Sequence, residues 1–351
     1  MSVATVATDR WERAWTFLKS QPVYWREAAL CAPAMPLLLI GGLATGRVLP
    51  AAVATGAAFC VGFGAARDFR RWRWGAMLAA TAGTTATAFI GCLAGQQLAT
   101  LLVAAAIAAA ACAVTALMDE DLWWISLQMV IALVIAGAYS GPFPAALARS
   151  QAVLAGGVVQ MLVVVPLATL APSAAQRLPA GPPKPPSPVK LYISHAARAA
   201  VCVCASLWLA RRLGLGNGYW APMTAMIVLK PGLSDTVVRG LARVTGTLIG
   251  CIVATIYASA VGYAAPWLIA AVAFCATSAF ALQKSHYAIL TSAVTATVVL
   301  LISLATKHAA LNAEHRLLAT LLGGGMALVV ARIAPHRPPE AQPAFDQVGG
   351  A

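Results

Sequence analysis

The sequence is poor in charged residues, and acidic residues are the scarcest of these. Only 10% of its 351 residues are Asp, Glu, Lys or Arg and just 11 are acidic, whereas 60% are hydrophobic. Soluble globular domains carry about 25% charged residues. The composition therefore excludes a soluble globule and predicts an all-α, polytopic membrane protein.

The chain also lacks the motifs of ATP hydrolysis and of metal catalysis. It contains no Walker sequence, no glycine-rich phosphate loop before a predicted strand, and no His-Glu or Cys-His cluster at ligand spacing. The eight cysteines all fall in apolar segments without paired spacing, as expected of small packing residues. These absences argue against an ATP-driven pump in one chain, an enzyme, a metal site and a bound cofactor.

Carboxylates are missing from the middle of the apolar runs, where proton-coupled transporters often place one. This weakens an antiport mechanism or moves the proton to other groups. The remaining candidates are Asp235, at a predicted helix end, and His195 and His286, because the reference pKa of an imidazole lies near neutrality. Each of these residues is also typical of a loop or an interface.

What the sequence does contain is a series of apolar runs of membrane-spanning length, about 18 to 22 residues for roughly 30 Å of hydrocarbon. Twelve such runs can be placed, in two sets of six. The first set lies near 28–46, 48–66, 75–94, 98–118, 124–143 and 151–171. The second lies near 191–213, 219–234, 239–262, 264–282, 286–306 and 315–334.

The two sets predict two membrane halves, 28–171 and 191–335, joined by a Pro-rich cytoplasmic linker over 172–190. Residues 1–27 predict an amphipathic segment on the inner membrane surface, and residues 336–351 a cytoplasmic tail. Glycine and arginine positions recur faintly between the halves. An even number of helices in each half then predicts two parallel six-helix repeats, although chance similarity of Ala-rich helices is an alternative.

The distribution of basic residues predicts the orientation in the membrane. The predicted location is the cell inner membrane, with both termini in the cytoplasm. In this orientation seventeen Lys and Arg residues lie on the cytoplasmic side and six on the outer side. The net charge of +13 then reflects topology rather than nucleic-acid binding. The expected partners are the lipid bilayer and a small molecule, and a homo-oligomer is left open.

The stretch 217–250 is the most informative part of the chain. Pro231 and Gly232 interrupt a membrane-length apolar run, which then resumes carrying Arg239 and Arg243. Residues four apart lie on one face of a helix, and an arginine there is costly unless it meets an anion, a carboxylate or water. The alternative is a topology anchor at the end of a helix.

This stretch resembles the fusaric acid resistance (FUSC) and aromatic acid exporter family. The first part of the resemblance lies in Tyr219-Trp220-Ala221, Thr224, Val228-Leu229, Pro231, Arg239, Arg243, Gly246-Thr247 and Gly250. The second part lies in His286-Tyr287-Ala288, Leu290-Thr291, 298–301, Arg316, Thr320-Leu321 and Gly323. The match covers roughly 195–335 well and 26–171 only through helix number and spacing. The chain lacks the sizeable soluble domain that many members of the family carry.

The resemblance implies an inner-membrane exporter of organic, aromatic carboxylic acids or related toxic compounds. Arg239 and Arg243 would attract the carboxylate, and Tyr219, Trp220 and Tyr287 would line an apolar wall for the ring. Thr224 and Thr247 would be neutral hydrogen-bond partners. Two other classes stay open: an organic-anion channel, which needs the same basic lining, and a non-transporting membrane scaffold for envelope assembly.

Overall fold

The structure is a computed structural model that describes residues 16, 20–67, 69, 72–172 and 187–334. The described part is helical and contains no strand. Its helices are α2 (Trp25–Cys31), α3 (Ala34–Ala44), α4 (Val48–Gly62), α5 (Gly75–Ala94), α6 (Leu98–Met118), α7 (Glu120–Ala138), α8 (Phe143–Leu170), α9 (Val189–Arg212), α10 (Trp220–Val228), α11 (Leu233–Ala260), α12 (Ala265–Ala281), α13 (Tyr287–Thr306) and α14 (Ala309–Ile333).

Among the described residues, nine helical stretches are long and apolar enough to cross a membrane, with α2 and α3 together forming one of them. Every run expected from the sequence overlaps a helix, but the run 219–234 is interrupted between Val228 and Leu233. However, α4, α10 and α12 have 15, 9 and 17 residues, which is short for a full crossing. The chain is therefore a multi-pass helical membrane protein, and the number of twelve spans stays a prediction.

Apolar side chains are distributed as lipid requires. Large residues such as Ile107, Leu241 and Phe274 are exposed on the outside of the bundle, whereas much of the interior consists of Ala, Gly and Thr. Small residues allow helices to approach closely where no hydrophobic effect drives them together. Alanine-rich segments such as α6 therefore form many of the inner contacts, and many large apolar side chains face outward.

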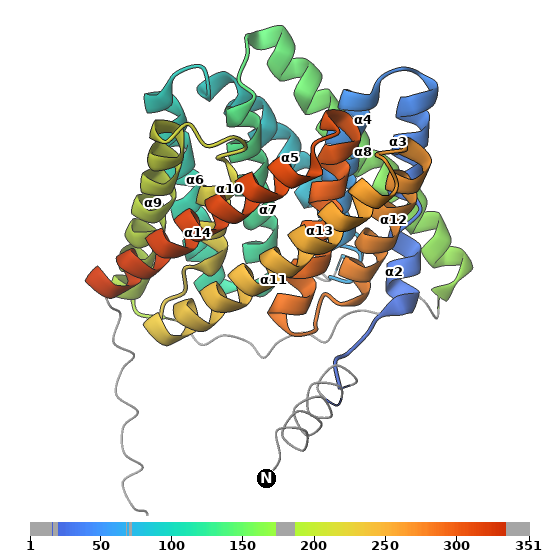
Figure 1. The fold of residues 1–351 in the computed structure, drawn as a ribbon. Helices are drawn as coiled ribbons and strands as arrows, with labels where there is room; N and C mark the ends of the chain where they lie inside the picture. Colours follow the sequence, from blue (N-terminus) through green and yellow to red (C-terminus); the bar gives the residue numbers. More distant parts are fainter. Residues whose placement is uncertain (1–15, 17–19, 68, 70–71, 173–186, 335–351) are drawn as a thin grey trace, which may run out of the picture.

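The same pairs of helices, taken in chain order, pack in each half. In the first half, α5 packs on α7 and α8, α4 on α8, and α6 on α7. In the second, α11 packs on α13 and α14, α10 on α14, and α12 on α13. The halves meet where α6 lies against α9 and α12 against α2 (Figure 1).

The helix ends form two faces. The lower face in Figure 1 contains the end of α8, the start of α9 and the end of α14, and the upper face contains the connections α7–α8 and α9–α10. Ion pairs hold the lower face. Arg67 Nη1 lies 2.7 Å from Asp121 Oδ1, and Lys284 Nζ lies 3.4 Å from Glu120 Oε1. These contacts tie the connections α4–α5 and α12–α13 to the start of α7.

Several expectations concern residues outside the described part. These are most of the amphipathic segment 1–27, most of the linker 172–190, and the tail 336–351.

One charge has a different environment from the one expected. Arg316, which the topology count assigns to an outer loop, is buried within α14, because that helix begins earlier than expected, at Ala309.

Candidate functional site

A break separates α10 from α11 in the second half. α10 ends at Val228, and the chain runs through extended residues, including Leu229 and Gly232, to α11 at Leu233. All nine residues of α10 are buried, so this short helix is surrounded by protein. Non-helical backbone at membrane depth is tolerated only where protein or water satisfies it.

Arg198 of α9 satisfies the backbone of this break. Its Nη1 and Nη2 each lie 3.2 Å from the carbonyl oxygen of Pro231, and Nη1 also donates to Ala334 O at 3.1 Å. Thr236 Oγ1 accepts from Lys230 N at 3.0 Å on the other side of the break. Sequence analysis gave Arg198 no role, because its carbonyl partners lie far away along the chain.

Arg239, Arg243 and Tyr287, here called the Tyr287 cluster, meet where α11 packs on α13. Arg239 Cζ lies 3.6 Å from the centre of the Tyr287 ring, and Arg243 Nη1 donates to Tyr287 Oη at 3.3 Å. Gly246 makes this close contact feasible, because a Cβ there would overlap the backbone oxygen of Ala288. The four-residue spacing thus directs both guanidinium groups to one phenol.

A second arginine–aromatic contact lies between α14 and α10. The Cζ of Arg316 lies 3.4 Å from the ring centre of Trp220, and the Trp220 ring packs on Tyr219 with centroids 4.8 Å apart. We call these three residues the Trp220 cluster. Arg316 is only 1% exposed. In the sequence, only the place of Arg316 in the family resemblance singled it out.

The two clusters are electrostatically linked. α11 packs on α14, and Arg243 lies close enough to Arg316 for their like charges to interact. Among the described residues, no acidic side chain forms an ion pair with Arg239, Arg243 or Arg316. Buried arginine charges without a counter-ion are costly, so this interior is suited to bind an anion.

The helices that carry these clusters also carry unpaired donors. Arg239 Nε, Arg243 Nε, and Arg316 Nε and Nη1 are buried without a hydrogen-bond partner in the described structure. The hydroxyls of Thr224 on α10 and Thr247 on α11 are likewise buried and unpartnered. A ligand carboxylate, which accepts up to about four hydrogen bonds, has the chemistry that these groups require.

Three sequence candidates lie apart from the clusters. Asp235 is exposed in the first turn of α11. His286 is exposed and caps α13, with its Nδ1 accepting from Ala288 N at 3.4 Å. His195 is buried beside the break, with its Nδ1 3.3 Å from Arg198 Nη2. These positions give local structural roles to both histidines.

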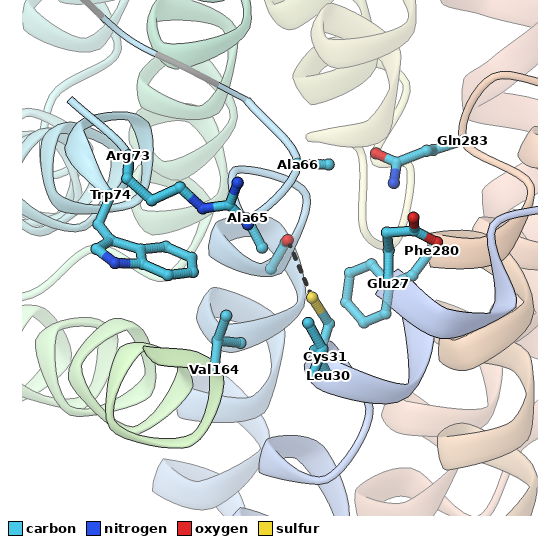
Figure 2. Close-up of a pocket in the computed structure, with 11 residues that line it drawn as sticks. Glu27, Leu30, Cys31, Ala65, Ala66, Arg73, Trp74, Val164, Phe280 and Gln283 are labelled. Atoms are coloured by element: carbon cyan, nitrogen blue, oxygen red, sulfur yellow. Dashed lines mark hydrogen bonds between the residues drawn. The ribbon is translucent and has the colours of Figure 1, made fainter. Parts of the chain in front are cut away.

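A small cavity lies between the first half and the end of α12, lined by residues that include Glu27, Arg73, Trp74 and Phe280 (Figure 2). Its volume of about 10 Å³ is enough for about one water molecule. Glu27 is a buried carboxylate that sequence analysis did not single out. Glu27 lies just before an apolar run, so the sequence did not predict its burial. The burial becomes visible only where α2 packs against α12.

No group of three His, Cys, Asp or Glu side chains in the described ranges could hold a metal ion.

Comparison with known proteins is consistent with the resemblance seen in the sequence. Residues 203–330 match the family described as fusaric acid resistance protein-like, which confirms that resemblance. The matched range includes both clusters and the break. No curated protein and no solved structure matches the chain. Over residues 203–330, the second half of this multi-pass membrane protein is thus similar to the family described as fusaric acid resistance protein-like.

Proposed function

We propose that the protein is a transporter of the cell inner membrane that exports organic, aromatic carboxylic acids, with both termini in the cytoplasm. The observation that carries this proposal is the Tyr287 cluster, in which two arginines without acidic partners among the described residues meet one phenol inside a membrane bundle. The family description, which names resistance to an organic acid, supports the same direction.

Charge and stacking together define the substrate class. The carboxylate binds the N–H groups of Arg243 and Arg239, because a guanidinium offers five donors in a planar fork. The aromatic ring packs against Tyr287 and Trp220, where ring pairs contribute about 0.5–1.5 kcal/mol beyond their buried area. Thr224 and Thr247 supply neutral donors on the two helices that flank the break.

The break supplies the movable element. Discontinuous helices form the substrate sites of many transporters because their free ends present backbone dipoles at membrane depth. α10 and α11 are the two parts of such an interrupted segment, and Arg198 holds the carbonyl of Pro231 between them. A change in the Arg198 contacts would change the angle between α10 and α11.

Two parallel six-helix repeats are part of the proposal. The repeated helix pairs support it, and so do two close contacts. A Cβ at Gly156 would overlap the carbonyl oxygen of Ala54, and a Cβ at Gly323 would overlap that of Ala221. The step along the sequence from Gly156 to Gly323 equals the step from Ala54 to Ala221. The Tyr287 cluster lies in the second half, so the proposed pathway is asymmetric.

The test is flux of radiolabelled benzoate in proteoliposomes, with and without an imposed pH gradient. Arg239→Ala with Arg243→Ala is compared with Arg47→Ala with Arg332→Ala, two arginines exposed at helix ends. We expect gradient-dependent flux that only the first pair abolishes. Gradient-independent flux at rates beyond those of a carrier contradicts the exporter in favour of a channel. No flux of benzoate, or of any other acid in a panel of radiolabelled aromatic carboxylates, contradicts transport of this class and favours the scaffold.

A further inference from the structure

A cavity of about 320 Å³ lies at the upper face, between the ends of α7 and α9 and the connection into α10. Its lining includes two phenols, Tyr139 and Tyr219, and the guanidinium of Arg211, among apolar residues such as Leu207. Small-molecule sites have volumes of about 300–1,000 Å³ and combine apolar walls with a few polar groups. The cavity therefore has the size and chemistry for one small aromatic acid.

Positive charge surrounds this cavity. Arg211 is fixed by the hydrogen bond from its Nη2 to Gly137 O, at 2.9 Å. The Cζ of Arg149 lies 4.7 Å from the ring centre of Tyr139, whose own ring lies 5.9 Å from that of Tyr219. Neither arginine has an acidic partner within the described ranges. Like the Tyr287 cluster, the cavity thus combines arginine side chains with tyrosine rings.

The Trp220 cluster connects this cavity with the Tyr287 cluster. Tyr219 is a wall of the cavity and also packs on Trp220. Arg316 lies over the ring of Trp220 and close to the charge of Arg243. Arginine and aromatic groups thus follow one another from Tyr287 to the upper face.

Among these residues, Arg316 has the greatest need of a ligand that accepts hydrogen bonds. It is almost completely buried, and its Nε and Nη1 have no partner in the described structure. Stacking on an indole satisfies the face of a guanidinium but none of its N–H groups. An anion passing between the two sites would satisfy them in transit.

We propose that the upper cavity is a second binding site for the transported anion, and that Arg316 and Trp220 form the passage to it from the Tyr287 cluster. The aromatic ring of the ligand packs against Tyr139 and Tyr219, and its carboxylate binds Arg211. The choice of an aromatic carboxylate as ligand rests on the proposed function, whereas the position of the site rests on the cavity.

The test is photolabelling of the full-length protein in nanodiscs with 4-azidobenzoate, with excess benzoate as competitor and the labelled segments mapped by mass spectrometry. We expect labelling, prevented by benzoate, of residues 138–139 or 214–219 and also of the segment that begins at Tyr287. Competed labelling at Tyr287 alone overturns the second site and leaves the proposed function intact. Competed labelling of the cavity alone supports the cavity and overturns the Tyr287 cluster as a site, and no competed labelling overturns both.

Ala138→Phe tests the cavity without altering a charged or stacking residue. Ala138 lines the cavity and is exposed, so the larger side chain can enter it without disturbing the core. We expect loss of labelling in the cavity, retained labelling at Tyr287, and reduced benzoate flux. The control is Ala99→Phe, at an exposed alanine near the start of α6. Cavity labelling that neither the Ala138→Phe substitution nor excess benzoate reduces would overturn the proposal.

Discussion

The guanidinium of Arg316 lies over the indole of Trp220, with 3.4 Å between Cζ and the ring centre, and two of its nitrogens have no hydrogen-bond partner in the described structure. The contact joins α14 to α10, the short helix that ends at the break. A stacked guanidinium in a low-dielectric interior gains about 2 kcal/mol or more from the ring, but its desolvation costs more than that. The balance suits a residue that is completed by an anion.

Arg316→Met tests whether this arginine serves transport or folding. Replacing a buried charge with an apolar side chain of similar volume is often neutral or stabilising by about 1–4 kcal/mol. We therefore expect an unchanged or higher Tm without substrate, together with loss of benzoate flux. Thermal unfolding and proteoliposome flux measure the two effects separately. A lower Tm with normal flux per folded molecule would assign Arg316 a purely structural role.

Tyr287→Phe removes the hydroxyl that accepts from Arg243 and keeps the ring beneath Arg239. A hydrogen bond of this kind contributes about 1 kcal/mol, so we expect the KM for benzoate to rise about fivefold with little change in maximal flux. Tyr287→Leu also removes the ring and should weaken transport further. Equal kinetics for the wild type and both variants would show that Tyr287 does not contact the substrate.

Arg198→Leu should destabilise the protein, because it removes the hydrogen bonds that Arg198 donates to the part-buried carbonyl oxygens of Pro231 and Ala334. An intramolecular hydrogen bond contributes about 1 kcal/mol, which predicts a fall in Tm. Arg198→Lys should recover only part of the loss, since an ammonium lacks the planar fork that reaches both carbonyls. If Arg198→Leu has the wild-type Tm, Arg198 does not hold the break.

The glycine run of α14 offers matched variants for the packing of α14 on α10. Gly323→Ala should destabilise the protein by about 1–3 kcal/mol through overpacking against Ala221 O. Gly325→Ala meets no atom within 4 Å and should be neutral or slightly stabilising. Gly156→Ala should resemble Gly323→Ala, because it meets Ala54 O in the same way. Similar Tm values for all three variants would contradict the close helix contacts.

Much of the fold could be predicted from the sequence, because lipid leaves few options for a chain this apolar. Pro231 and Gly232 also marked the break, since neither residue favours the middle of a helix. The i, i+4 spacing of Arg239 and Arg243 predicted a shared face, and both arginines contact Tyr287. In each case the signal lies within a few neighbouring residues.

The remaining parts of the site depend on contacts between distant segments. Arg198 and Pro231 meet across the fold, and Arg316 meets Trp220 from the opposite end of the second half. Periodicity shows which residues share a helix face but not which helix that face meets. The apolar run of α10 also gave no sign that only nine residues would be helical and buried on all sides.

The most direct test of the central claim is efflux of benzoate from proteoliposomes by Arg243→Gln, with Arg332→Gln as the matched control at the exposed end of α14. Gln keeps part of the volume and hydrogen-bonding capacity of the arginine but removes its charge. Loss of pH-gradient-driven efflux in Arg243→Gln alone, with equal amounts of folded protein, is the result that the anion site predicts. Equal efflux from both variants would contradict it.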